Sequence, residues 1–234
     1  MSAKVIINFS GNTGKSTTAD NLLAPRMGNA KIVRIETINA HEGDADENMT
    51  GKQYGDLVDG AALFDDLVVD VGSSNVEVFQ RLMNQYKGSH NIWDYFVVPV
   101  VPSDKQIKDT ISTIEALSSG GIPANKIRLL FNKVESEDVD LEKAFAPIFN
   151  YYNAEKKFTL NTSAVVYEHE FFSRAREQGK TIQDILDDKT DYNALIKSAE
   201  TPEDKLMYSR KRALIWLATE LNEKLDKAFK ALFE

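Results

Sequence analysis

Residues near the start of the chain have the types and spacing of a loop that binds phosphate. Positions 10 to 17 read SGNTGKST, between a short apolar run and an amphipathic stretch. Gly11 and Gly14 let the backbone turn tightly, so that successive N–H groups point into one concavity at the positive end of the following helix. Lys15 would then reach the β- and γ-phosphates of a nucleotide, and the hydroxyl of Ser16 would coordinate Mg²⁺.

One position departs from the usual spacing of such loops. Glycine is expected where this chain has Phe9, so the motif by itself is also compatible with a glycine-rich turn that carries an incidental lysine. The surrounding sequence favours phosphate binding, because a strand pattern ends directly before the loop and a helical pattern begins directly after it.

A second element of such a site is an acidic residue at the carboxyl end of a neighbouring strand, close to the magnesium shell. Residues 67–72 read LVVDVG, which places Asp70 after three apolar residues and two positions before Gly72. This glycine would free the backbone near the γ-phosphate. A buried or capping aspartate is the alternative, but the two elements together favour a nucleotide site.

Apolar, β-rich runs alternate with helical patterns along the chain, and each run is nearly continuous, as in strands covered on both faces. The expected strands are Lys4–Asn8, Lys31–Glu36, Asp66–Asp70, Tyr95–Val101, Ile127–Asn132 and Phe158–Leu160. The expected helices are Lys15–Leu23, Asn75–Tyr86, Asp104–Leu117, Leu141–Tyr152 and Glu168–Arg176. This alternation predicts a doubly wound α/β fold with a mostly parallel sheet flanked by helices.

The strand signal disappears after about residue 181. Leucine and phenylalanine recur at three- and four-residue spacing over 207–233, which predicts one long helix. We expect a phosphate-loop domain over 1–185 and a C-terminal helical extension over 186–234, packed on the same domain. An interface with a partner and a membrane-surface helix are the alternatives for the long helix.

The composition limits the classes of protein. The 234 residues carry a formal net charge of −8 and no cysteine, which excludes disulfides, thiolate zinc sites and a chain-held iron–sulfur cluster. There is no run of about 18 apolar residues and no leader pattern, so we expect a cytoplasmic protein without a membrane partner. Arg210, Lys211 and Arg212 form a dense basic cluster that could contact DNA non-specifically, with a solvated helix face as the alternative.

Several segments, in their order along the chain, resemble the ParA/MinD family of deviant phosphate-loop ATPases. Residues 31–36 (KIVRIE) resemble the family's second strand, which ends in a first switch acid, here Glu36. Residues 94–104 resemble a strand that ends in proline and leads into a helix beside the nucleotide. Residues 129–134 (LLFNKV) resemble the strand that ends in the base-reading asparagine, here Asn132.

Residues 176–181 (REQGKT) resemble a late turn of the family, so the resemblance covers about residues 4–185. It implies ATP and Mg²⁺ as ligands and catalytic roles for Lys15, Asp70 and Glu36. It also implies that Ser16 coordinates Mg²⁺ directly and Asp70 through water. The implied nucleotide-binding residues are Gly11, Asn12, Thr13, Gly14, Lys15, Ser16, Thr17 and Asn132.

Within the family, residues 8–11, 23–26, 38–40 and 72–75 most resemble the StbB-type plasmid stability proteins of conjugative plasmids. This resemblance implies an ATP-binding, weakly hydrolysing switch in the bacterial cytoplasm that acts in plasmid partition, stability or positioning, with a link to conjugation. It further implies a homodimer or partner-dependent dimer and a DNA-binding adaptor protein as partner.

Two positions depart from the family pattern. Ser10 stands where members of this kind usually carry a lysine that reaches the partner's phosphates, and a short, uncharged hydroxyl cannot make that contact. Ile38 stands at the second switch acid and cannot orient water, although Glu42 or Asp44 could supply a carboxylate from the same loop. We therefore expect slow, Mg-dependent hydrolysis and weak or partner-dependent dimerisation, with the γ-phosphate still able to order loops.

The identity of the base is a separate question. Residues 132–135 read NKVE and are similar to the guanine-reading N-K-x-D of GTPases, with Glu135 one carbon longer than aspartate. Alternatively, Lys133 and Glu135 are solvated loop charges after a structural asparagine. The family resemblance favours ATP over GTP.

Two other functions are compatible with the sequence. One is a metabolic phosphate-loop enzyme of the same fold, such as a ligase or a kinase-like enzyme, although no clear acid–base pair for a substrate is visible. The other is a non-catalytic adaptor that nucleotide merely stabilises. His41 lies in an acid-rich loop, and a solvated loop is favoured over a metal site there because no second histidine is near.

Overall fold

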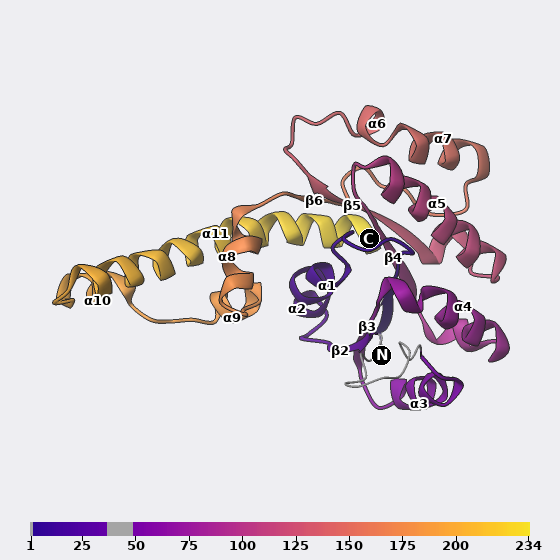
Figure 1. Ribbon diagram of the computed structural model, residues 1–234, viewed down its shortest axis with the longest axis horizontal. Coiled ribbons are helices and arrows are strands. Elements are labelled where there is room, and N and C mark those ends of the chain that lie inside the picture. Colours follow the sequence, from indigo (N-terminus) through magenta and orange to yellow (C-terminus); the bar gives the residue numbers. More distant parts are fainter. Residues whose placement is uncertain (1, 37–48) are drawn as a thin grey trace, which may run out of the picture. The chain divides into compact units, whose positions relative to one another are not determined.

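The computed structural model describes residues 2–36 and 49–234. Within them, a six-stranded parallel sheet has the order β2-β3-β1-β4-β5-β6 (Figure 1). The strands are β1 Ser2–Ile6, β2 Lys31–Ile35, β3 Asp66–Val71, β4 Tyr95–Val100, β5 Ile127–Val134 and β6 Val165–Tyr167. The predicted doubly wound α/β fold is confirmed.

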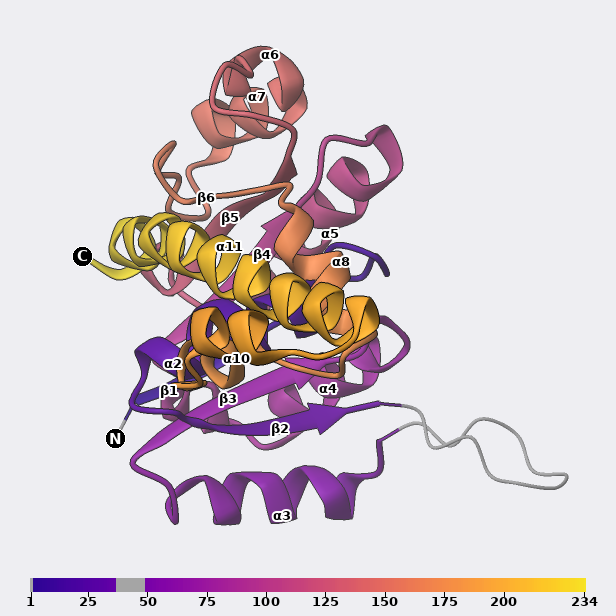
Figure 2. The ribbon, with the colours of Figure 1, turned by 90° about the vertical axis from the view of Figure 1, so that its left-hand side faces the viewer.

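Helices follow most strands, as the alternating pattern predicts. They are α1 Lys15–Thr18, α2 Ala24–Arg26, α3 Gly51–Ala61, α4 Val76–Gln85, α5 Asp104–Ser119, α6 Leu141–Ala144, α7 Ala146–Glu155, α8 Glu170–Glu177, α9 Ile182–Leu186, α10 Tyr192–Ser198 and α11 Pro202–Phe233. Helices α3, α4, α5 and α7 cover one face of the sheet, and α3 runs beside its β2 edge (Figures 1 and 2). The predicted long helix is α11, which begins at Pro202, five residues before the predicted start.

The core explains why the strands read as continuous apolar runs. Val5 and Ile7 belong to the hydrophobic cluster under α3, α4 and α5, while the intervening Ile6 is equally buried on the opposite face. Val5 is paired with Val69 of β3 and with Phe96 of β4, so β1 lies in the middle of the sheet. Side chains of a central strand are buried on both faces, as is typical of doubly wound sheets.

The helix after β1 is continuous from Lys15 to Arg26, with a π-helical turn at Ala19–Leu23. Pro25 has no N–H to donate to the carbonyl of Asn21, and its ring would crowd that group in a regular α-helix. The guanidinium of Arg26 donates to the Asn21 carbonyl instead, at 2.9 Å. The π-helical turn therefore accommodates a proline inside the helix.

Two elements differ from the sequence predictions. The predicted strand Phe158–Leu160 is wrong, because only Thr159 forms an isolated bridge, with Arg128, and the sixth strand is β6. Helix α3 was not predicted, since three glycines lower its helix propensity. A capping box formed by Thr50 and Gln53 and the buried Tyr54 stabilise it.

By its internal packing the chain forms two compact units. One comprises Met1–Glu168 with Ala228–Glu234, and the other comprises His169–Lys227. In the first unit, a cation–π contact links the end of α11 to β1. Nζ of Lys4 lies 4.8 Å from the ring centroid of Phe233. The predicted domain boundary at residue 185 stays a prediction.

Candidate nucleotide-binding site

The predicted phosphate loop lies at the carboxyl end of β1, in the middle of the sheet. From β1 the chain crosses first to β2 and β3 on one side and then to β4 on the other. In open α/β sheets, ligands bind in the crevice at this reversal of strand order. The register places Asp70 of β3 beside Ile6, the last residue of β1, so the predicted acid lies next to the loop.

The backbone of the loop is shaped by two residues with positive φ. Asn12 has φ 58° and Gly14 has φ 82°, and asparagine is among the few non-glycine residues that adopt this region readily. A Cβ atom at Gly14 would also lie 2.4 Å from Nδ2 of Asn132. Only glycine fits this position without a shift of its neighbours.

The loop leaves donors available for an anion. The N–H groups in the first turn of the helix that starts at Lys15, including Ser16 and Thr17, have no intrahelical partners, and within the described part of the chain no side chain caps them. Among the described residues, Oγ1 of Thr13 is buried and has no hydrogen-bond partner. Backbone donors and an unpaired hydroxyl at one loop fit a polyphosphate ligand.

Lys15 is folded back under the loop. Its Nζ donates to the carbonyl oxygens of Asn8 at 3.2 Å and Ser10 at 2.8 Å, and the residue is 8% exposed. Because an ammonium group has three donors, one stays available for a phosphate oxygen. Burial lowers the pKa of Lys15, and the charge of Asp70 partly opposes this shift.

Asp70 is buried between β2 and the helix that starts at Lys15, which is called the loop helix below. Desolvation raises the pKa of its carboxyl group, while a hydrogen bond from Ser16 and the charges of Arg34 and Lys15 act in the opposite direction. The structure thus brings together the three side chains predicted to serve phosphate and Mg²⁺: Lys15, Ser16 and Asp70. A hydroxyl and a carboxylate are hard oxygen ligands of the kind that Mg²⁺ prefers, so this donor set fits the metal.

Arg34 is a member of the site that sequence reasoning missed. It lies opposite Asp70 on β2, with Nε 3.9 Å from Oδ2 of Asp70, and its guanidinium also pairs with Asp20 of the loop helix. Its side chain is 41% exposed, so the pair is only partly shielded from solvent. The sequence signal was a charged residue in the interior of a strand that also begins with the charged Lys31.

A buried polar network fixes the start of the loop and was also missed. Nδ2 of Asn8 donates to the carbonyl of Pro99 at 2.9 Å and to Oγ1 of Thr110 at 2.7 Å. The N–H of Ser10 donates to Oδ1 of Asn8, and the N–H of Phe9 donates to Oγ1 of Thr113. These two N–H groups are therefore engaged by the protein, and phosphate contacts would come from the later part of the loop.

Asn132 and Lys133 connect the end of β5 to the loop. Nδ2 of Asn132 donates to the carbonyl of Thr13 at 2.7 Å, and its Oδ1 accepts from the N–H of Lys133. Nζ of Lys133 donates to the carbonyl of Asn12 at 2.9 Å. The second amide hydrogen of Asn132 has no acceptor in these contacts, and base recognition by this residue stays a prediction.

Gly72 allows the end of β2 to approach β3. Its N–H donates to the carbonyl of Ile35 at 2.8 Å, and a Cβ atom at this position would lie 2.9 Å from the same oxygen. A Cβ atom there would also lie 3.6 Å from Cα of Glu36, so this exposed predicted acid stands beside the glycine turn. Ile38, His41, Glu42 and Asp44 lie outside the described residues.

The predicted basic cluster lies on α11 in the unit His169–Lys227. The guanidinium of Arg212 donates to Oδ1 of Asn193 at 2.7 Å and lies 4.8 Å from the ring centroid of Trp216. Consecutive residues on a helix point about 100° apart, so Arg212 points away from the direction of Arg210, whereas Arg210 and Lys211 line the same hollow. No helix in the described part of the chain has the length and apolarity to cross a membrane.

Several solved structures resemble the chain, whereas no family model and no curated protein matches it. Apo McdA of Cyanothece is 14% identical with a TM-score of 0.52, covering 94% of this chain and 99% of that one. pNOB8 ParA is 12% identical with a TM-score of 0.52, covering 98% of each chain. A chain of the MinC:MinD cell division protein complex of Aquifex aeolicus is 14% identical with a TM-score of 0.50, covering 94% of this chain and 95% of that one.

The fold and the loop define a phosphate-loop α/β protein. At these identities the likeness concerns the fold, which is that of McdA, MinD and ParA. The ParA/MinD resemblance seen in the sequence is therefore confirmed at the level of the fold, and the closer StbB-type resemblance stays a prediction.

Proposed function

We propose that this protein is an ATP-binding switch of the ParA type. The observation that carries the proposal is the grouping of Lys15, Ser16 and Asp70 beneath a loop whose helix has no side-chain cap. Burial of a lysine and an aspartate is costly, since each charge is removed from water. A phosphate chain with its magnesium would add charged partners to the contacts that Lys15 and Asp70 already make.

Each residue has a role that follows from its position. Backbone N–H groups of Gly11 to Thr17 would hold phosphate oxygens, and the free donor of Lys15 would contact the terminal phosphates. Ser16 would coordinate Mg²⁺, with Asp70 acting through water. When bound, Mg-ATP would supply a γ-phosphate whose presence or loss distinguishes two states. Glu36, beside Gly72, would transmit that difference to the segment after β2.

We infer that hydrolysis is slow. Ser10 is buried and cannot place a positive charge on the phosphates of a partner subunit. A charge of this kind stabilises negative charge that develops in the transition state, and removing one such group commonly costs about 3–4 kcal/mol. Dimerisation would accordingly be weak or dependent on a partner protein.

The biological setting proposed is plasmid partition, stability or positioning in the bacterial cytoplasm, as in StbB-type proteins with a link to conjugation. A DNA-binding adaptor is the proposed partner, and Arg210, Lys211 and Arg212 would add direct DNA contacts. One solved relative in fold is in complex with a second protein, MinC, which supports a partner-reading role. The ParA/MinD resemblance favours ATP over GTP.

Titration calorimetry with Mg-ATP tests the proposal directly. Lys15→Ala should weaken binding by at least about 100-fold, because it removes a buried charge from the phosphates. Lys87→Ala, at an exposed position after α4, is the matched control and should bind as the wild type does. Unchanged affinity of the Lys15 variant would overturn the proposal.

A nucleotide panel separates the finer parts of the proposal. ATP, ADP, GTP and a slowly hydrolysed ATP analogue are added to the wild-type protein, and affinity and molar mass are measured. We expect preference for ATP and little dimer without a partner. Preferential GTP binding would reject the ATP assignment, and a tight ATP-dependent dimer of the pure protein would reject the inference from Ser10.

A further inference from the structure

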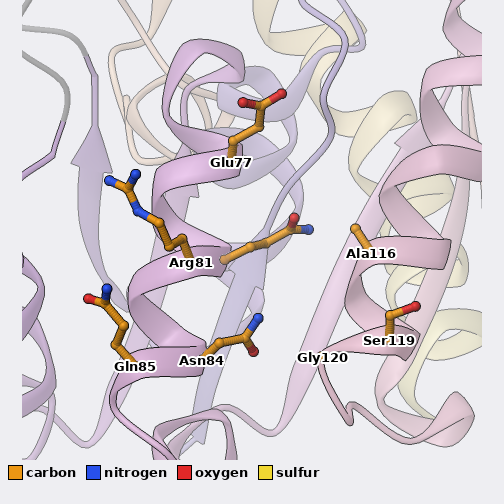
Figure 3. A pocket seen from close by; sticks show the side chains of 8 residues that line it. Glu77, Arg81, Asn84, Gln85, Ala116, Ser119 and Gly120 are labelled. Atoms are coloured by element: carbon orange, nitrogen blue, oxygen red, sulfur yellow. The ribbon is translucent and has the colours of Figure 1, made fainter.

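A groove of about 540 Å³ runs between α4 and α5, outside the nucleotide site (Figure 3). Gln80 and Asn84 line it from α4, and Ala116, Ser119 and Gly120 line it from α5. Its volume is within the range of about 300–1,000 Å³ that is usual for ligand sites. The proposed switch uses none of these side chains.

One side chain in the groove has an unmet hydrogen-bonding requirement. Gln80 is 9% exposed, and among the described residues its Nε2 has no hydrogen-bond partner. A buried donor without an acceptor costs about 1–3 kcal/mol, so an unpaired amide of this kind calls for an explanation. A ligand that brings an oxygen acceptor into the groove would remove this cost.

The opposite wall is formed by small residues. Ala116 and Gly120 are one turn apart on or directly after α5, and a Cβ atom at Gly120 would already lie 3.2 Å from Oδ1 of Asn84. Larger side chains at these positions would fill the space between the helices. The small residues therefore keep a channel open along the amide groups of α4.

The groove continues towards the phosphate loop. Glu77 lines it and also lines a second cavity of about 520 Å³, together with Phe9 and Ser73. Oγ of Ser73 lies 3.7 Å from where a Cβ atom of Gly11 would be. The Glu77 end of the groove therefore lies beside the cavity that Phe9 and Ser73 line.

We propose that this groove binds a short extended segment of a partner protein, with a backbone carbonyl accepting from Gln80. Uncharged amides and a hydroxyl, at Gln80, Asn84 and Ser119, match the donors and acceptors of a peptide backbone. Arg81 also lines the groove, although its side chain points away from α5 in Figure 3. The groove would be the surface on which the proposed switch binds its partner, so this proposal rests on the proposed function. Peptide binding is nevertheless measured without nucleotide, so the two proposals can fail separately.

The probe is a phage-displayed library of random peptides, selected on the immobilised wild-type protein and counter-selected on Ala116→Trp. Synthetic copies of the enriched peptides are then titrated against purified variants. Gln80→Leu should weaken binding about tenfold, as expected for one lost hydrogen bond. Ala116→Trp should abolish binding, and Asn153→Trp, at an exposed position of α7, should leave it unchanged.

A stability measurement distinguishes a binding role from a structural one. Because Nε2 of Gln80 has no partner among the described residues, Gln80→Leu should keep or raise the melting temperature while it weakens peptide binding. Three results would each overturn the proposal. The first is a lower melting temperature of Gln80→Leu, and the second is a selection that yields no peptide able to discriminate wild type from Ala116→Trp. The third is a changed molar mass of Ala116→Trp. The last result would assign the groove to a second copy of the chain. Failure of Mg-ATP binding alone would reject the switch and leave the peptide result intact.

Discussion

The side-chain amide of Asn132 donates a hydrogen bond to the carbonyl oxygen of Thr13 at 2.7 Å, across 119 residues of sequence. Nδ2 of the same amide lies 2.4 Å from where a Cβ atom of Gly14 would be. Asn132 therefore supports the loop from outside, at the point where the backbone has positive φ. The residue expected to recognise the base also holds the shape of the phosphate loop, so the two roles are physically connected.

Asn132→Ala should destabilise the protein by about 1–3 kcal/mol, because the buried carbonyl of Thr13 loses its donor. Mg-ATP affinity should fall as well, since the loop loses a support. Denaturant unfolding and calorimetry measure the two effects. Asn153→Ala, at an exposed position of α7, is the control and should change neither. Equal stability of Asn132→Ala and wild type would contradict the supporting role.

Gly14→Ala should destabilise the protein by more than the strain of a positive φ alone would. A non-glycine residue in the left-handed region costs about 1–2 kcal/mol, and here the new Cβ would also meet Nδ2 of Asn132 at 2.4 Å. Gly88→Ala is a matched control, because Gly88 has φ 100° but nothing within 4 Å of a Cβ. Chemical denaturation should therefore show a larger loss for Gly14→Ala than for Gly88→Ala.

A double variant separates the two costs. In the Asn132→Ala background the clash is absent, so adding Gly14→Ala should cost about as much as Gly88→Ala does, about 1–2 kcal/mol. Additive effects of the two single variants would mean that the loop avoids the contact by another route.

The sequence was sufficient for the parts of the fold and site that depend on local patterns. Continuous apolar runs predicted the strands Tyr95–Val100 and Ile127–Val134 within one to two residues, because both are buried on each face. The loop and Asp70 were found for a similar reason, since glycine spacing and a strand-end acid are local features. Helix α3 and the three-residue strand β6 gave weak signals, because glycines and short length obscure periodicity.

Contacts between distant segments could not be predicted in this way. The bonds of Asn8 with Thr110 and of Lys133 with Asn12 depend on how β1, α5 and β5 meet, which no local pattern encodes. Arg34 is the clearest example, because a charged residue in a strand is ordinarily assigned to an exposed face. Here it lies opposite Asp70, and the assembled sheet determines that pairing.

Arg34→Met should alter the magnesium dependence of ATP binding. Without the guanidinium, Asp20 and Asp70 would present two carboxylates with less positive charge nearby, and a divalent cation would bind more tightly. Because Arg34 is 41% exposed, solvent screening limits the effect, and we expect a shift of about two- to tenfold towards lower Mg²⁺ concentration. ATP titrations at graded Mg²⁺ concentrations measure it. Arg34→Lys keeps the charge and should remain close to wild type, whereas a shift towards higher Mg²⁺ in Arg34→Met would contradict this electrostatic role.

Asp188 should make the stability of the unit His169–Lys227 depend on pH in acid. Hydrogen bonds from Thr190 and Tyr192 lower the pKa of Asp188 to about 2. A carboxyl group with a depressed pKa in the folded state contributes stability that is fully present above its ordinary pKa of 3.8 and is lost as pH falls through about 2. Asp188→Asn should therefore cost about 1 kcal/mol near neutral pH, or roughly 2–4 °C in melting temperature.

The same substitution should have a clearly smaller effect at a pH of about 2, where about half of the wild-type carboxyl is already protonated. Melting curves by circular dichroism across this range measure the difference. Tyr192→Phe removes one of the donors and should give a smaller loss with the same pH dependence, because the bond from Tyr192 Oη to Asp188 Oδ2 is 2.7 Å long. A pH-independent difference between Asp188→Asn and wild type would show that side-chain packing, rather than the charge of the carboxylate, stabilises this turn.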